Sequence, residues 1–255
     1  MKRIIFSTLA ATGLIVAAIW YFSDAPTPKE EIIRARQAAR FQSTLIKARG
    51  GDLKAKVAVA GYYKDGIGVK KNPALAERFY HRAARRGQPV AQYELGRMYE
   101  TGTGVRIDYL KAAEWYRLAA GLGGNRDAQY ALGQLYFTGR GVINDYAAAV
   151  PWFRKAANQG HPAALYLMGA VYLEGWSVST DPIEAYKWFS LALPVADQAM
   201  AFDSSYNPAR ALRRLKPKMN KFQISRAEKK AALWKPRMER PAIVMQGRRL
   251  LPAGQ

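Results

Sequence analysis

A single residue pattern recurs four times between Asp52 and Pro194, and this internal repeat limits the chain to folds built by stacking copies of one unit. In each copy a tyrosine is followed three residues later by a glycine, and successive copies are 36, 37 and 36 residues apart. The tyrosines are Tyr63, Tyr99, Tyr136 and Tyr172, and the glycines are Gly66, Gly102, Gly139 and Gly175. A repeat of this length is typical of solenoids made from helix pairs.

Each copy predicts two helices joined by a short loop. The glycine stands just past the tyrosine helix, where the chain must adopt a left-handed conformation that glycine reaches at little cost. An Asn or Asp six residues later caps the second helix, and Asp181 with Glu184 has the spacing of a capping box. The expected first helices are 53–64, 90–101, 127–138 and 163–174, and the expected second helices are 73–86, 109–122, 146–158 and 182–194. The sequence therefore predicts an all-α fold, a right-handed α-α solenoid of four helix-pair repeats with helical caps.

Two positions depart from the repeat. Trp176 is followed by Ser177 where the usual pattern is a polar residue and a glycine. A large aromatic residue in a loop either anchors a partner or fills space under a cap, and both roles stay open for Trp176, the candidate protein-binding residue. Pro151 lies inside an expected second helix, where the loss of an amide donor predicts a kink.

The segment Ala91–Gly123 resembles the repeat of the Sel-one-like repeat (SLR) proteins, relatives of the tetratricopeptide solenoids. The shared residues are Leu95-Gly96, Tyr99, Gly102-Thr103-Gly104-Val105, Asp108, Lys111-Ala112, Trp115-Tyr116, Ala119-Ala120 and Gly123. The resemblance covers residues 52–194, and Trp234-Lys235-Pro236 is similar to the Trp-x-Pro near which the family's basic capping helix ends. It implies a helical solenoid that serves as a binding surface for another protein.

The segments on either side of the repeats predict caps. Residues 30–49 form an amphipathic helix, and short helices are expected at 208–216 and 224–235, with Leu212, Leu215, Ile224 and Leu233 in contact with the last repeat. The expected domains are an anchor at 1–23, a linker and capping helix at 24–51, four repeats at 52–196, basic capping helices at 197–240 and a flexible basic tail at 241–255.

Residues 4–22 carry no charge, and a helix of this length spans a hydrocarbon core of about 30 Å. The run ends in three aromatic residues, Trp20, Tyr21 and Phe22, which suit a membrane interface better than a cleavage site. We expect one uncleaved transmembrane helix in a bacterial inner membrane; a cleaved signal and a buried soluble helix are the alternatives. Basic residues on the two sides nearly balance, so a periplasmic repeat domain is preferred and a cytoplasmic one stays open.

The net charge of +21 is concentrated towards the two ends of the chain. Residues 1–23 carry +2, residues 24–89 carry +9, residues 90–202 carry −1 and residues 203–255 carry +11. A neutral middle argues against a uniformly basic nucleic-acid-binding face. The candidate anion-binding residues are Arg210, Arg213, Arg214, Lys216, Lys218 and Lys221, for which a solvated charged face is the alternative.

The sequence contains no recognisable catalytic or metal site. Cysteine is absent, which excludes disulfides, thiolate metal sites and cysteine nucleophiles. His81 and His161 are 80 residues apart, and each is expected to be a surface histidine. The repeated Gly-x-Gly-Val lacks the Lys-Ser pair and the preceding strand of a phosphate loop. We therefore expect no enzyme activity, no cofactor and no small-molecule substrate.

These features favour a membrane-tethered adaptor that binds another protein and organises an envelope complex, with basic flanks selecting a partner that has an acidic surface. The alternative is an electrostatic binder of anionic lipid, wall polymer or nucleic acid that uses the two basic ends. Purely ionic binding weakens as salt rises, so ionic strength distinguishes the two functions.

Overall fold

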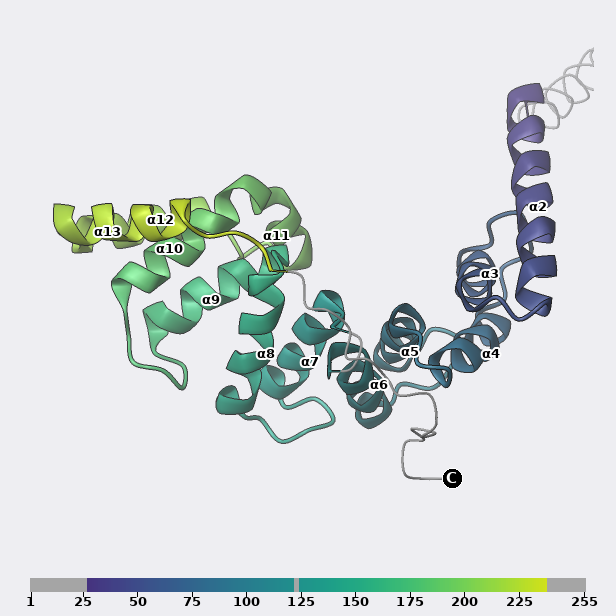
Figure 1. Ribbon diagram of the computed structural model, residues 1–255, viewed down its shortest axis with the longest axis horizontal. Coiled ribbons are helices and arrows are strands. Elements are labelled where there is room, and N and C mark those ends of the chain that lie inside the picture. Colours follow the sequence, from purple (N-terminus) through teal and green to yellow (C-terminus); the bar gives the residue numbers. More distant parts are fainter. Residues whose placement is uncertain (1–26, 122–123, 238–255) are drawn as a thin grey trace, which may run out of the picture.

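The computed structural model describes residues 27–121 and 124–237, and every regular element within these ranges is helical (Figure 1). Helix α2 (Pro28–Arg49) precedes four helix pairs. The first helices of the pairs are α3 (Leu53–Asp65), α5 (Pro89–Thr101), α7 (Arg126–Thr138) and α9 (Pro162–Glu174), and the second helices are α4 (Pro73–Ala84), α6 (Tyr109–Gly121), α8 (Tyr146–Asn158) and α10 (Pro182–Ala192). The chain continues through η1 (Leu193–Val195), α11 (Ala196–Phe202), α12 (Pro208–Leu215), η2 (Lys216–Lys218) and α13 (Lys221–Ala232).

The four pairs stack side by side into an arch, which confirms the helix-pair solenoid (Figure 1). Helices α3, α5, α7 and α9 line the inside of the arch, and the second helix of each repeat packs on the first helix of its own repeat and of the next. All eight predicted repeat helices are confirmed to within two residues at each end. Helix α2 covers α3 at one end of the stack, and α13 lies along α10 at the other.

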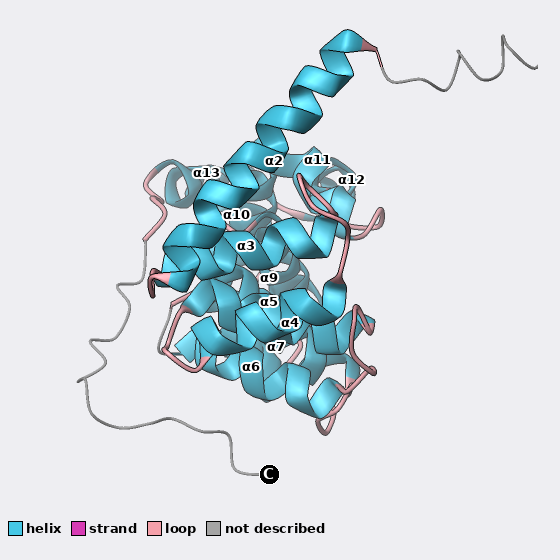
Figure 2. Cartoon of the chain, turned by 90° about the vertical axis from the view of Figure 1, so that its right-hand side faces the viewer, coloured by secondary structure: helices cyan, strands magenta, loops and turns pink. Residues whose placement is uncertain are grey.

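Only the second half of α2 belongs to this stack. Phe41, Leu45 and Ala48 are buried against α3, whereas residues 28–37 are all exposed. Figure 2 shows the first half of α2 projecting beyond the other helices. The helix therefore combines a packed cap with an exposed stalk.

A glycine in each of the last three inner helices lets an aromatic ring of its partner helix approach the backbone. A Cβ atom added at Gly96 would stand 2.5 Å from the Tyr116 ring, and one at Gly133 would stand 2.7 Å from the Phe153 ring. Tyr116 and Phe153 are fully buried. The small and aromatic positions of the repeat are thus two halves of one contact, because the ring fills the space that a side chain on the inner helix would occupy.

The acidic and amide residues of the repeat do cap its helices. Asp145 Oδ1, for example, accepts the backbone N–H of Ala148 at 3.0 Å. The predicted capping box of the last repeat is wrong in one half: Asp181 accepts two backbone N–H groups, but Glu184 turns away from it. Glu184 instead accepts hydrogen bonds from Lys187 at 2.9 Å and from Lys230 of α13 at 2.5 Å. Burial opposes ionisation of this carboxyl, but the two lysines lower its pKa overall.

The carboxyl-terminal cap differs from the prediction. Helix α13 begins at Lys221 rather than 224 because Asn220 and Gln223 form a capping box there. The expected contacts of Leu212, Leu215 and Ile224 are confirmed, but Leu233 is 73% exposed because the chain turns Trp234 inward instead, edge-on to Trp188. Helix α11 was not predicted at all.

Three further expectations concern Pro151 and the two ends of the chain. Helix α8 runs as one element through Pro151. None of the helices in the described ranges is both long and apolar enough to cross a membrane. The predicted span at 4–22 and the predicted tail at 241–255 lie outside the described residues.

The glycine contact gives a stability prediction. Gly96→Ala forces its methyl group against Tyr116, whose hydroxyl is held by Glu100, so the ring is not free to retreat. We expect the free energy of unfolding to fall by about 1–3 kcal/mol, the usual cost of overpacking. Gly121→Ala is the matched control: its methyl meets open space in a helix, and stability should stay equal or rise. Urea denaturation followed by circular dichroism measures both, and equal effects would contradict the close-contact explanation.

Candidate protein-binding surface

The inner face of the arch carries a tyrosine at the same position of three successive inner helices. These residues, Tyr93, Tyr130 and Tyr166, are separated by the repeat interval and are half-buried. Val57 holds the equivalent position in the first repeat. Burial raises the pKa of Tyr93 to about 12, so its ring stays neutral and offers a hydroxyl beside an apolar surface.

Over the first two repeats this face is charged. A hollow of about 370 Å³ lies between α3 and α5, with Lys64, Glu94 and Arg97 in its wall. Lys64 Nζ is 2.7 Å from a Glu94 oxygen, and both side chains are largely covered. Arg97 makes a longer 3.7 Å contact with Glu94, lies 5.9 Å from the centre of the Tyr93 ring and keeps 50% of its side chain exposed. Arg97 is therefore a cation that this surface presents to solvent, and the exposed Lys71 in the same wall is another.

The outer helix α6 holds side chains of the inner face in place. Tyr116 of α6 donates its hydroxyl hydrogen to Glu100 of α5 at 2.6 Å, and burial together with the Glu100 charge raises the pKa of Tyr116. The Tyr116 ring also lies 5.8 Å from the ring of Tyr93. The outer helix thus fixes the orientation of side chains on the inner face.

Over the last two repeats the same face is covered by the chain itself. Tyr206 stacks on Tyr166 at 5.0 Å between ring centres and accepts a hydrogen bond from Gln134 at 3.0 Å. Phe202 of α11 meets the edge of Tyr130 at 5.2 Å. No sequence motif identified Phe202 and Tyr206 as residues of the inner face. The feature that could have done so is the unusual length of the connector between α10 and α12, residues 193–207, which carries both.

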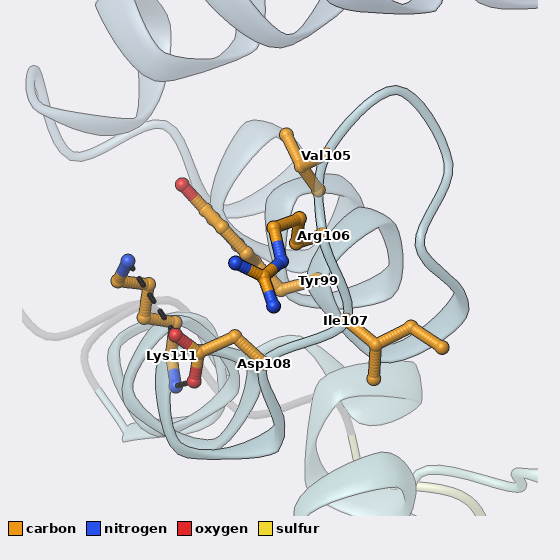
Figure 3. A pocket seen from close by; sticks show the side chains of 6 residues that line it. All are labelled: Tyr99, Val105, Arg106, Ile107, Asp108 and Lys111. Carbon is orange, nitrogen blue, oxygen red and sulfur yellow. Dashed lines mark hydrogen bonds and ion pairs between the residues drawn. The ribbon is translucent and has the colours of Figure 1, made fainter.

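A second hollow, of about 560 Å³, lies at the loop between α5 and α6 (Figure 3). The Arg106 side chain points into it, and Lys111 lies 5.5 Å from the Tyr99 ring centre and 3.4 Å from Asp108. The backbone N–H of Lys111 donates to Asp108, which lowers the pKa of that carboxyl. An equivalent hollow follows one repeat later, lined by Tyr136 and its neighbours. Because it recurs with the repeat, we attribute this hollow to the stacking geometry rather than to a dedicated site.

Trp176 lies at the loop edge of the arch, away from the inner face. Its ring is half-buried, 4.9 Å from Phe137 and 6.3 Å from Tyr146 between ring centres, both in the preceding repeat. The neighbouring Ser177 keeps the positive φ of the glycine that it replaces. Trp176 thus packs between the third and fourth repeats, and its role as an anchor for a partner stays a prediction.

The six candidate anion-binding residues lie together at the carboxyl-terminal cap. They occupy α12, η2 and the first residue of α13, and all six are exposed. Within the described part of the chain, none of them forms an ion pair. Their charge is therefore unneutralised by the fold. The members are Arg210, Arg213, Arg214, Lys216, Lys218 and Lys221.

The histidines take structural positions. His161 was expected at the surface, but it is buried, because its Nδ1 caps α9 by accepting the backbone N–H of Ala164 at 3.3 Å. Burial lowers its pKa to about 3. His81 meets the edge of Trp115 at 5.7 Å. Across residues 27–121 and 124–237, no group of three or more potential metal ligands is found.

A family model for the Sel1 repeat matches residues 54–88, 89–124, 126–161 and 162–193, more than half of the chain. The chain belongs to the Sel1 repeat family. Each matched copy corresponds to one helix pair of the arch, and Sel1 repeat proteins generally mediate protein–protein interactions. No curated protein sequence matches the chain.

A solved structure of a similar protein agrees with this fold. The crystal structure of a Sel1 repeat protein from Oxalobacter formigenes is similar with a TM-score of 0.56 and 29% identity, covering 70% of this chain and 71% of that one. A protective antigen of uropathogenic Escherichia coli that displays an SLR fold has a TM-score of 0.43 and 23% identity, covering 78% of this chain and 56% of that one.

The position of Trp176 gives a testable distinction. Trp176→Ala removes the packing between the third and fourth repeats, and we expect the free energy of unfolding to fall by about 2 kcal/mol, less than for a fully buried tryptophan. Ile143→Ala at the same edge is the control, since Ile143 is 87% exposed and its loss should change stability by less than about 0.5 kcal/mol. Urea unfolding of both variants checks this, and a Trp176 variant as stable as wild type would return this residue to a binding role.

Proposed function

We propose that this Sel1 repeat protein is a membrane-anchored adaptor that binds another protein on its inner face and organises or stabilises a complex of the bacterial cell envelope. The general role of the family in protein–protein interaction supports the binding function. The observation that carries the proposal is the exposed, charged inner face over the first two repeats, where Arg97 stands beside a hollow of about 370 Å³.

The chemistry of this face favours a partner segment with carboxylates. Arg97 can donate two parallel hydrogen bonds to a carboxylate, and its only ion-pair contact among the described residues is the 3.7 Å approach to Glu94. Residues 24–89, which include α2 and the first repeat, carry a net charge of +9 and attract an acidic partner during its approach. Affinity then comes from the neighbouring Tyr93 ring and the fixed helices beneath it.

The proposed location is the bacterial inner membrane, with residues 4–22 as a single span and the repeats in the periplasm. The uncharged length of that segment supports the span. The exposed first half of α2 is suited to hold the repeats away from a membrane surface. The adaptor would therefore present its inner face to proteins of the same compartment.

Charge reversal on the two faces of the arch tests the proposal. Full-length wild type, Arg97→Glu and Arg78→Glu are used to capture crosslinked proteins from membranes, with washes at low and high salt. Arg78 is exposed on α4, an outer helix, and provides the same charge change away from the inner face. We expect a fixed set of proteins to survive the high-salt wash with wild type and Arg78→Glu. Capture by Arg97→Glu should fall about tenfold or more, equivalent to about 1.4 kcal/mol.

Two results would contradict this function. Equal capture by Arg97→Glu and Arg78→Glu would show that the inner face does not select the partner. Loss of every captured protein at high salt would show that capture depends only on non-specific charge attraction, which salt screens.

The six exposed basic residues of the carboxyl-terminal cap, which form no ion pair among the described residues, favour a second candidate function. This function is the binding of anionic lipid by α12, η2 and the start of α13. Juxtamembrane basic residues each contribute about 1 kcal/mol to attraction by an anionic surface. The full chain in nanodiscs of phosphatidylglycerol should exchange the amide hydrogens of α12 more slowly than in phosphatidylcholine. The triple variant Arg210→Gln, Arg213→Gln, Arg214→Gln should lose that difference, whereas Arg78→Gln should keep it. Identical exchange in the two lipids would exclude this role.

A further inference from the structure

The connector after the fourth repeat is far longer than the others. Consecutive repeats are joined by residues 85–88, 122–125 and 159–161, whereas residues 193–207 separate α10 from α12. A turn of three or four residues is enough to join one pair to the next in this stack. The extra length therefore has to be explained by what the connector does.

The connector folds back onto the inner face rather than running outside the stack. Helix α11 packs against α9, and Figure 1 shows it on the inner side of the arch. Ala199, in the middle of α11, is completely buried. An Asx turn at Asp203, whose carboxylate accepts the N–H of Ser205 at 2.8 Å, then reverses the chain so that Tyr206 also points at the inner helices.

Two aromatic side chains, four residues apart, make the specific contacts. Phe202 lies 5.2 Å from Tyr130 and 4.9 Å from His161 between ring centres. Tyr206 stacks on Tyr166 with the ring planes 19° apart, and Gln134 donates to its hydroxyl at 3.0 Å. Tyr130 and Tyr166 hold the repeat position that Tyr93 holds in the second repeat, where the connector does not reach. The connector therefore occupies the same surface that the inner face leaves open over the first repeats.

The connector is held on the inner face by few residues, and the residues that follow α11 are polar and exposed. Helix α11 has seven residues, which is too short to be stable alone in water, and Phe202 remains 52% exposed. Asp203, Ser204 and Ser205 are exposed. In contrast, the helices on both sides of the connector, α10 and α12, contribute buried residues to one cluster. Residues 196–206 could therefore leave the inner face while the stack and its cap stay folded.

We propose that residues 193–207 are an internal ligand that closes the inner face over the third and fourth repeats, and that a partner segment bearing two aromatic side chains four residues apart displaces it. This inference rests on the proposed protein-binding function, and it assigns the aromatic part of the partner to the tyrosines of α7 and α9. Because the internal ligand is tethered, its effective concentration is in the millimolar range, so it competes strongly with a free segment.

The chain's own connector is the probe that tests this. A fluorescein-labelled peptide with the sequence of residues 193–208 is titrated against the full-length protein in detergent micelles, and fluorescence anisotropy reports binding. The double variant Phe202→Ala, Tyr206→Ala should bind the peptide at least ten times more tightly than wild type does. A peptide carrying the same two alanines is the control probe and should not bind the variant.

Hydrogen exchange shows whether the rest of the fold is intact. In the double variant the amides of residues 196–206 should exchange faster, whereas those of α3 to α10 should be unchanged. A folded double variant that fails to bind the peptide, or a wild type that binds it equally well, would overturn the proposal. If the double variant does not fold, Tyr206→Ala is measured in the same way, and loss of folding in that variant too would overturn it by making the connector part of the core.

This outcome is independent of the adaptor test, because the probe is the chain's own segment and no natural partner is needed. Peptide binding without partner capture would keep the internal ligand and reject the adaptor. Capture that depends on Arg97, without peptide binding, would keep the adaptor and make the connector a permanent cap.

Discussion

The arch depends on the close contact between an inner-helix glycine and an outer-helix aromatic ring. In the last three repeats the ring of Tyr116, Phe153 or Phe189 stands where a glycine's side chain would be, and each ring is fully buried. The first repeat has Ala60 at this position, and its partner Tyr80 is also buried. A ring held against the backbone fixes the distance and the rotation of the two helices together, because neither partner has another low-energy position to adopt. Every repeat then presents its inner helix in the same orientation.

That shared orientation is what gives the inner face its regularity. A tyrosine at one position of the repeat recurs along α5, α7 and α9, and its ring always lies near the contact that holds the pair together, as Tyr93 does beside Tyr116. Differences between repeats then arise from neighbouring positions. Arg97 and Gln134 occupy equivalent places, one offering charge to solvent and the other a hydrogen bond to Tyr206. The scaffold and the specificity of the surface are therefore carried by different residues of the same helices.

This division explains how far the sequence could predict the molecule. Repeat glycines, caps and aromatic pairs act locally or between adjacent helices, so the eight helices of the arch followed from these residues and their spacing. The capping role predicted for Glu184 was wrong because its carboxylate binds Lys230 instead of the nearby backbone N–H. Lys230 is 46 residues away in the sequence and reaches Glu184 only after the cap has folded. Helix α11 was missed because seven residues are too few for a stable isolated helix, so it depends on its contacts with α9. The inner face was out of reach for the same reason, since Arg97 and Tyr206 look like ordinary surface residues in the sequence.

The two halves of the inner face differ in what a partner must do to bind them. Over the first two repeats, Arg97 is half exposed, Tyr93 is half-buried and the connector reaches neither, so binding requires only that water be displaced. Over the last two, the stacked Tyr206 and the Phe202 edge must first be removed, so the cost of releasing the connector is subtracted from the affinity of any partner. A segment that contacts only the open half gains nothing from displacing the connector. A segment long enough to cross both halves would be selected for carboxylates at one end and for paired aromatic residues at the other, which is a narrower requirement than either half imposes alone.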